Sequence, residues 1–461
     1  MACNYSLDSF CPEAWSQIEI DAEGDFKICC LANFDKDFGM AVDENGQVMN
    51  VMTHTIVEAM NSATHKQHRY EMSQNQKPKR CRSCFDSEEA TKGVSEFKER
   101  SQYGLSKRQR VIQNTSRAIP EYVKYDQAQA VTLEDGTLIN PKIVNLDIRF
   151  GNLCNQKCIM CSPQHSNLWY DDWVAIGYGP PQYNRKRGVY KKGEVKTYEF
   201  FKDEYGRNKM SGMEPWWETE RWWNMFEEIA PSLRYIYFTG GEPLIVPSMQ
   251  KCLDILIDKG FAKHIQLRFD TNLSVINQKV IDKFKHFKDV LLCVSIDDTG
   301  DRYNTIRFPG NFEQILQNIY TLKENNINIH YISTCVGIAS PYSIIRMAEL
   351  AEELKVGTYF RFLEGPNWLD IRNYPASAKL EIIENLNKHM GHSQTYNKWA
   401  KAEIKLLEKY MDHSEEKHLK EFIRVMDLLD KQRNTDWKTA LPDVAELFQK
   451  HTNLLINWVF I

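Results

Sequence analysis

Between residues 142 and 363 the sequence alternates six times between strand-like and helix-like patterns. The strand-like runs cover residues 143–150, 234–239, 264–270, 290–296, 327–334 and 358–363. Apolar residues recur at helical spacing between these runs, for example over residues 312–322 and 347–354. Alternating strands and helices are typical of parallel sheets with right-handed crossovers. We therefore predict an α/β fold over residues 142–370, a partial (β/α)6 TIM-like barrel with its reactive loops at the strand C-termini.

The first strand-like run leads directly into a loop that carries three cysteines. Cys154, Cys158 and Cys161 lie within eight residues of one another. Cysteines this close together, when they are not in disulfides, typically hold a metal or an iron–sulfur cluster as thiolates. The C-x3-C-x2-C spacing supplies three ligands where a closed site takes four. We therefore expect a cluster with one iron open to another molecule.

A second group of cysteines lies in residues 1–100. Residues 15–30 alternate as a β-hairpin does, with a turn at Glu23-Gly24, and residues 56–72 have a helical pattern. The C-x2-C pair has a recurrent metal-ligand spacing, and the remaining ligands would be Cys11 and one of two adjacent cysteines. From the residues alone, a structural zinc site, an iron–sulfur cluster and free thiols all stay open. The cysteines concerned are Cys11, Cys29, Cys30, Cys81 and Cys84, with Cys3 undecided.

Three further segments carry less specific signals. Residues 101–141 have little periodicity and are predicted to be a linker, and residues 371–461 are predicted to be a helical extension with apolar packing faces. Residues 171–215 form an insertion that is either a solvated loop or a lid for an acidic or phosphorylated substrate. Four tryptophans follow it and are expected to pack on the barrel. The basic residues of the insertion are Arg185, Lys186, Arg187, Lys191, Lys192, Lys196, Lys202, Arg207 and Lys209.

The composition limits the compartment and the class of partner. A formal net charge of -4 over 461 residues gives no overall basic bias towards nucleic acid and no acidic bias towards disorder. No apolar run approaches the ~20 residues of a membrane span, and the N-terminus lacks a signal-peptide pattern. We therefore expect a cytoplasmic protein whose 12 cysteines are not disulfides. Cys252, Cys293 and Cys335 lie in apolar contexts and are expected to be core residues.

Two motifs in the predicted barrel resemble those of the radical S-adenosylmethionine (SAM) superfamily. The three-cysteine loop follows the first strand, and Gly240-Gly241-Glu242-Pro243 follows the second. The resemblance covers residues 142–363. It implies that the three thiolates hold a [4Fe–4S] cluster, and that the amine and carboxylate of SAM chelate the open iron. Reductive cleavage of SAM would then give a 5′-deoxyadenosyl radical that abstracts a hydrogen atom from a substrate.

The same resemblance implies roles for individual residues. The Gly240–Pro243 segment would receive the SAM ammonium, with Glu242 supplying complementary charge. Met160 would cover the adenine, Asn272 would contact the ribose, Ser295 lies at the fourth strand end, and Arg307 would meet the SAM carboxylate. For Asn272, Ser295 and Arg307 the alternative is ordinary hydrogen bonding at strand ends.

The N-terminal cysteines resemble the opening of SPASM and twitch domains, which bind auxiliary iron–sulfur clusters. Cys11 is followed by twelve residues and then by Gly24-x4-Cys29. With Cys81 and Cys84 this implies four ligands for one auxiliary cluster, [4Fe–4S] in type, and favours Cys29 over Cys30. In most relatives this domain follows the barrel, whereas here it precedes it. The layout resembles twitch-domain radical SAM proteins, including ones carried by phages.

The resemblance implies a radical SAM enzyme whose substrate is a peptide or protein, with an electron donor such as flavodoxin or ferredoxin. A sugar, nucleoside or nucleic-acid substrate is the alternative within the same class. Outside that class stands a non-catalytic protein that binds zinc or an iron–sulfur cluster. No residue of the sequence can be named as the acid, base or hydrogen donor towards the substrate.

Overall fold

The computed structural model describes residues 6–32, 39–91, 108, 122–124, 126–178, 182–183, 196–197, 199–204, 206 and 208–454. The chain divides into two compact units, which are described separately. The first unit comprises Met1–Leu153, Pro180–Phe269 and Gln278–Val290, and the second comprises Cys154–Gly179, Asp270–Asn277 and Leu291–Ile461. No helix among the described residues is long and apolar enough to cross a membrane.

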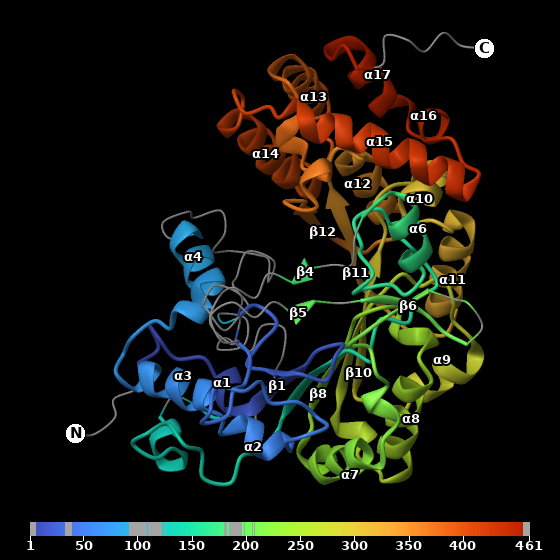
Figure 1. The fold of residues 1–461 in the computed structure, drawn as a ribbon. Coiled ribbons are helices and arrows are strands. Elements are labelled where there is room, and N and C mark those ends of the chain that lie inside the picture. The colour runs from blue at the N-terminus through green and yellow to red at the C-terminus, as the bar shows by residue number, and fades with distance from the viewer. Residues whose placement is uncertain are drawn as a thin grey trace. The chain divides into compact units, whose positions relative to one another are not determined.

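The first unit is built on a mainly parallel sheet with the strand order β9-β8-β3-β1-β2. Among the described strands of this sheet, β1 and β2 pair antiparallel and the other pairs are parallel. These strands are β1 (Gln17–Ile20), β2 (Phe26–Lys27), β3 (Asn145–Ile148), β8 (Tyr235–Phe238) and β9 (Gln266–Thr271). The helices are α1 (Glu13–Ser16), α2 (Ile56–Met60), α3 (Ala63–Ser73), α4 (Arg82–Thr91), α7 (Glu220–Ile229), α8 (Pro247–Asp258) and α9 (Gln278–Phe284) (Figure 1).

The predicted N-terminal hairpin is confirmed, and it also extends the parallel sheet. Glu19 opposes Lys27 across the hairpin, while Ile18 pairs in register with Leu146 of β3. Ile18 and Leu146 are fully buried. Because β1 joins the edge of β3, the cysteine-bearing N-terminal segment shares a hydrophobic core with the barrel strands.

The predicted helix over residues 56–72 is two helices, α2 and α3. Thr55 caps α2 through a capping box with Glu58. The Ser62 side chain accepts the N–H of His65 and so begins α3. The second cap breaks the helix that the apolar spacing alone predicted.

The second unit carries three parallel strands, β10 (Asp289–Ser295), β11 (Ile329–Val336) and β12 (Gly357–Phe362). The helical C-terminal region is confirmed and supplies five of the helices in the described part of this unit. The unit's helices are α6 (Trp169–Ala175), α10 (Gly300–Ile306), α11 (Phe312–Glu324), α12 (Ser343–Glu353), α13 (Ala376–Lys388), α14 (Gln394–Lys409), α15 (Glu416–Arg433), α16 (Trp437–Ala440) and α17 (Pro442–His451).

All six predicted strands are present among the described residues, so the fold class is confirmed as mixed α/β with mainly parallel strands. The insertion adds two short antiparallel pairs, β4 (Gln182–Tyr183) with β5 (Lys196–Thr197), and β6 (Phe200–Lys202) with β7 (Asn208–Met210). The basic residues Arg185, Lys186, Arg187, Lys191, Lys192 and Arg207 lie outside the described residues. The role predicted for this segment stays a prediction.

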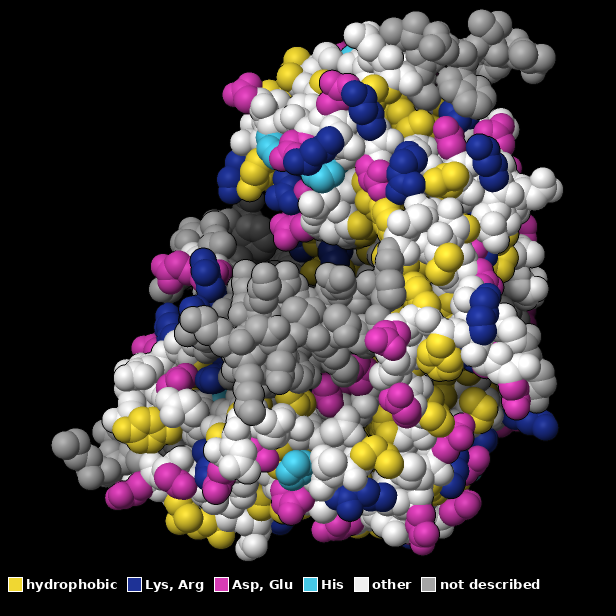
Figure 2. All heavy atoms as spheres, in the orientation of Figure 1, with side chains coloured by type: hydrophobic (Ala, Val, Ile, Leu, Met, Phe, Trp, Pro, Cys, Tyr) yellow, Lys and Arg dark blue, Asp and Glu magenta, His cyan; other side chains and the backbone are white. Residues whose placement is uncertain are grey.

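The tryptophans that follow the insertion pack as predicted. Trp222 is fully buried and meets Trp216 edge to face, with ring centroids 5.1 Å apart. Phe150, directly before the three-cysteine loop, packs against both rings. This aromatic cluster fixes the end of β3 from which the loop departs. On the described part of the face in Figure 2, acidic and basic side chains are interspersed, in keeping with the small net charge.

Candidate functional site

The three-cysteine loop lies in the second unit. Cys158 is buried, while Cys154 and Cys161 are half-buried. The Cys158 and Cys161 thiols are hydrogen bonded to each other. The pKa of Cys158 lies below its ordinary value, because that hydrogen bond and the charge of Arg307 outweigh the effect of burial. The same hydrogen bond, with burial, raises the pKa of Cys161 well above its ordinary value, so the two thiols share one proton and only one of them gains thiolate character.

Arg307 is held beside Cys158 by an acidic partner. Its Nη1 lies 3.8 Å from Cys158 Sγ, and its Nε lies 2.7 Å from Oδ2 of the fully buried Asp297. The other Asp297 oxygen accepts the N–H of Cys335 at 2.7 Å. Asp297 follows Ser295, the last residue of β10. The guanidinium predicted to meet a SAM carboxylate is thus fixed at the end of this strand, next to a predicted ligand thiol.

Asn272 connects the loop to the segment after β9. Its Nδ2 donates to Asn155 Oδ1 at 2.9 Å, and its Oδ1 accepts the Ser274 hydroxyl at 2.6 Å. Asn155 closes this network by donating to the same hydroxyl at 2.7 Å. Two other residues were predicted to lie at the SAM site. Ser295 of β10 pairs in register with Ser333 of β11, and Met160, which lies between Cys158 and Cys161 in the sequence, is half-buried. The predicted SAM contacts of these residues stay predictions.

The Gly240–Pro243 segment lies in the first unit, at the end of β8. Glu242 donates its N–H to the carbonyl oxygen of Leu153 at 2.8 Å, and Leu153 directly precedes Cys154 in the chain. A Cβ on Gly241 would lie 2.2 Å from that carbonyl oxygen. Gly240 and Gly241 have φ values of +78° and +55°, which only glycine adopts readily. The glycines are therefore required for the approach of this strand end to Leu153.

The four predicted auxiliary ligands line one cavity of the first unit. Cys11, Cys29, Cys81 and Cys84 share its wall with Glu13, His68, Arg80 and Arg108. Cys30 is not among the residues that line it. Cys3 lies outside the described residues. This arrangement supports Cys29 over Cys30 as a ligand.

Polar groups approach the sulfurs of this cavity closely. Glu13 Oε2 lies 3.9 Å from Cys29 Sγ, and His68 Nε2 lies 3.6 Å from Cys81 Sγ. Burial, with two nearby arginines, lowers the pKa of His68 to about 3, so its imidazole is neutral at physiological pH. Burial also raises the pKa of Cys81. Positive iron is the charge that would compensate four such thiolates.

The thiols at the two sites fit the iron–sulfur clusters that the sequence predicts. Four thiols around one cavity are the ligands of a closed iron–sulfur cluster, and three thiols in one loop leave a position open. Across the described parts of the chain, no three His, Cys, Asp or Glu side chains converge as they would on a single metal ion.

Several residues of both sites were missed in the sequence. Asp297 had a usable signal, because it is the first residue beyond a predicted strand. Glu13 and His68 gave none, since each approaches its cysteine from another part of the chain. Arg108 lay in the predicted linker, yet it lines the cysteine cavity. Cys252 and Cys293 are buried, as expected of core residues, whereas Cys335, for which the same was expected, is only half-buried.

Comparison with known proteins identifies two domains in the chain. Residues 148–351 match the radical SAM superfamily. Residues 11–85 match SPASM, an iron–sulfur cluster-binding domain. A radical SAM domain holds a [4Fe–4S] cluster and SAM, and a SPASM domain holds additional iron–sulfur clusters. None of the curated proteins matches the chain.

Solved structures with distant similarity include anSMEcpe with bound AdoMet, at 15% identity and a TM-score of 0.33, covering 54% of this chain and 58% of that one. SuiB from Streptococcus suis has 12% identity and a TM-score of 0.34, covering 72% of this chain and 63% of that one. SuiB bound to the precursor peptide SuiA has 12% identity and a TM-score of 0.31, covering 54% of this chain and 46% of that one. The chain thus spans about three fifths of the length of the first of these proteins.

Both domain matches contain the motifs described above, with Cys154–Cys161 and Gly240–Pro243 in one and Cys11, Cys29, Cys81 and Cys84 in the other. The chain therefore carries a segment that matches the radical SAM superfamily, residues 148–351, and ahead of it a segment that matches the SPASM iron–sulfur cluster-binding domain, residues 11–85.

Proposed function

We propose that this chain is a radical SAM enzyme that removes a hydrogen atom from a peptide or protein substrate. Cys154, Cys158 and Cys161 would hold the [4Fe–4S] cluster to which SAM binds. The observation that carries the proposal is the buried Cys158 thiol with Arg307 at 3.8 Å, in a loop that offers three ligands. When bound, the cluster and SAM supply reductive cleavage of SAM and a radical able to abstract hydrogen.

The chain's own residues would bind and orient these groups. Glu242 and the two glycines before it would receive the SAM ammonium, since the carboxylate supplies opposite charge and the glycines permit close approach of backbone. Arg307, held by Asp297, would stabilise the Cys158 thiolate and meet the SAM carboxylate. Asn272 would orient the loop through Asn155 and lies within reach of a ribose hydroxyl in this proposal.

The second group of cysteines would hold one auxiliary cluster. Cys11, Cys29, Cys81 and Cys84 provide a complete ligand set, so no iron is left for substrate. Such a closed cluster is suited to passing electrons, in this proposal between the substrate and a carrier such as flavodoxin or ferredoxin. A net oxidation of the substrate follows from that role.

The peptide class of substrate rests on the SPASM match, since enzymes with SPASM and twitch domains often modify peptides or proteins. A sugar or nucleoside substrate is the competing version. Supplying the reduced enzyme and SAM with a deuterated peptide digest, and separately with deuterated nucleosides and sugars, distinguishes them. Deuterium in 5′-deoxyadenosine from the peptides alone supports the proposal, and deuterium only from the small molecules contradicts it.

The activity itself is tested by anaerobic reconstitution with iron and sulfide. Two [4Fe–4S] clusters correspond to about eight irons per chain. With SAM and dithionite, the wild-type chain is expected to release 5′-deoxyadenosine. The matched control is C154A/C158A/C161A, which is expected to keep about four irons and to release none. Tightly bound zinc in the wild-type chain without SAM cleavage would contradict the enzyme and support a non-catalytic binding protein.

A further inference from the structure

The last residue of α15 reaches the cluster-binding loop. Arg433 Nη2 donates to the carbonyl oxygen of Lys157 at 3.0 Å, and Lys157 directly precedes Cys158. The Arg433 side chain is only 3% exposed. Arg433 lies 276 residues from Lys157 and outside the segment that matches the radical SAM superfamily.

A buried carboxylate holds both Arg433 and Lys157. Asp172 of α6 is fully buried, and its Oδ2 lies 2.7 Å from Arg433 Nε. Its Oδ1 lies 2.7 Å from Lys157 Nζ. The carbonyl of Lys157 is therefore fixed by Arg433 and its ammonium by Asp172, and its N–H donates to the Phe308 carbonyl at 2.6 Å. A buried charge network of this kind is stable only while each member keeps its partners.

The peptide on the other side of Cys158 is also held. Trp169 Nε1 donates to the Cys158 carbonyl oxygen at 3.0 Å. The guanidinium of Arg433 lies 5.0 Å from the Trp169 ring centroid and 5.1 Å from that of Phe308. Arg433 thus contacts the loop carbonyl and also packs against the two rings beside it, and its charge acts on the Cys158 sulfur.

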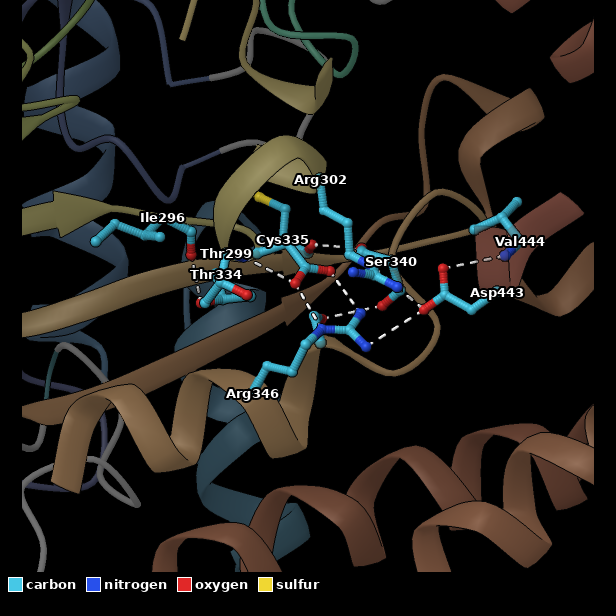
Figure 3. A network of polar contacts seen from close by, with 11 residues as sticks. Ile296, Thr299, Arg302, Thr334, Cys335, Ser340, Arg346, Asp443 and Val444 are labelled. Atoms are coloured by element: carbon cyan, nitrogen blue, oxygen red, sulfur yellow. Dashed lines mark hydrogen bonds and ion pairs between the residues drawn. The ribbon is translucent and has the colours of Figure 1, made fainter. Parts of the chain in front are cut away.

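The C-terminal helix α17 is also linked to the end of β10, through Arg346 of α12. Arg346 of α12 forms two 2.6 Å contacts with Asp298, which follows Asp297 directly. Arg346 also reaches Asp443 of α17 at 3.3 Å, and Arg302 of α10 approaches the same carboxylate at 3.5 Å. Figure 3 shows Arg346 and Arg302 both directed towards Asp443. The C-terminal region therefore contacts the cluster loop through Arg433 and reaches the strand end that holds Arg307 through Arg346.

We propose that Arg433 is a positioning residue for the cluster-binding loop, which fixes the backbone at Cys158 and adds positive charge that favours the reduced cluster. The proposal rests on the proposed function, because the loop must hold a cluster for its reduction potential to matter. The proposal has two physical reasons. A cation near an iron–sulfur cluster stabilises the electron that is added on reduction. Residues that hydrogen bond to the backbone or side chain of a ligand fix the geometry of that ligand.

The test compares R433Q, R433K and R424Q with the wild-type chain after identical anaerobic reconstitution. Arg424 is the matched control, because it lies on the same helix and donates to the Ile176 carbonyl at 2.7 Å. The measurements are iron content and the midpoint potential of the cluster whose EPR signal responds to SAM. For R433Q we expect a more negative potential and about 10- to 100-fold weaker iron retention. R433K should keep the potential nearer to wild type, and R424Q should match wild type in both.

A wild-type potential and wild-type iron retention in R433Q would overturn the proposal, and so would equal effects in R424Q. If R433Q does not fold, iron retention in R433K is the test instead. It should be weaker than in the wild-type chain, because the lysine loses the contact with the loop carbonyl. The rate at which iodoacetamide labels Cys158 in the iron-free chain separates this proposal from the proposed function. Several-fold faster labelling in R433Q than in R424Q is expected even if the wild-type chain does not cleave SAM, and equal rates contradict the positioning role.

Discussion

Glu242 donates its backbone N–H to the carbonyl oxygen of Leu153 across 2.8 Å. This hydrogen bond joins the end of β8 to the residue that precedes the first cysteine of the cluster loop, although the two lie 89 positions apart in the sequence. The end of β8 is thereby joined through backbone to the segment that leads into the cluster loop. The bond exists because Gly241 leaves room for the Leu153 carbonyl.

Replacing Gly241 with alanine is expected to break this connection. Its Cβ would lie 2.2 Å from the Leu153 carbonyl oxygen, at a φ of +55°. We expect G241A to lose SAM binding, measured by equilibrium dialysis with the reconstituted chain. G260A is the control, because Gly260 also has positive φ, at +75°, but nothing lies within 4 Å of its added Cβ. That variant should lose only about 1–2 kcal/mol of stability and keep SAM binding. Equal loss of binding in both variants would assign the effect to backbone strain.

The choice between the two adjacent cysteines is a second test. Cys29 lines the cavity with Cys11, Cys81 and Cys84, whereas Cys30 does not. We expect C29S to lose about four irons per chain after reconstitution and C30S to keep them. Iron analysis and the EPR spectrum of the auxiliary cluster measure this difference. Iron loss in C30S with full retention in C29S would reverse the assignment.

The strands and the cysteine motifs could be predicted because their signals are local. Alternating apolar residues predicted both the hairpin and the barrel strands, and short spacing grouped the thiols. Pairing partners are a property of the whole fold, so nothing local showed that Ile18 of β1 would pair with Leu146 of β3. The division into α2 and α3 was missed because a single capping serine, Ser62, outweighed a continuous apolar pattern.

The polar residues around the sulfurs could not be predicted from the sequence, because they too depend on the whole fold. His68, Arg108 and Arg433 each lie at least 13 positions from the group they contact. Such residues have no spacing rule, because any position of the right charge and length can reach the site once the fold places it. The ligands follow a motif, whereas the groups that position them follow only from the three-dimensional structure.

Arg108 is expected to stabilise the segment that leads to Cys11. It forms a short, largely buried ion pair with Glu88 and donates to the carbonyl oxygens of Leu7 and Phe10 at 2.8 and 2.9 Å. Truncation would remove this ion pair and both carbonyl contacts, so R108M should lower the free energy of unfolding by about 3–5 kcal/mol, measured by urea denaturation.

The control for this change is R82M. Arg82 pairs with Asp86 on the same helix as Glu88, but both side chains are about 60% exposed. We expect R82M to change the free energy of unfolding by about 0–1 kcal/mol. A similar, small change in both variants would show that the Arg108 contacts do not stabilise the N-terminal segment.

The buried carboxyl group of Glu403 is expected to make the stability of the folded chain depend on pH. This residue of α14 is fully buried, and within the described residues its carboxylate oxygens have no hydrogen-bond partner. Burial raises its pKa well above the ordinary value. In the unfolded chain the carboxyl has its ordinary pKa of about 4.3. In the folded chain it stays protonated to higher pH. Stability is therefore lost as pH rises through the unfolded pKa and on towards the folded one.

The variant E403Q removes this group without removing its volume. We expect E403Q to unfold at a higher temperature than the wild-type chain at pH 7, and we expect the difference to become small at pH 4, where most of the Glu403 carboxyl is protonated in the folded and the unfolded chain alike. Thermal unfolding from pH 4 to pH 8 measures the effect. Glu408 lies on the same helix and is exposed, so E408Q should follow the wild-type curve at every pH. A constant difference between E403Q and wild type over this range would contradict titration of Glu403 as its cause.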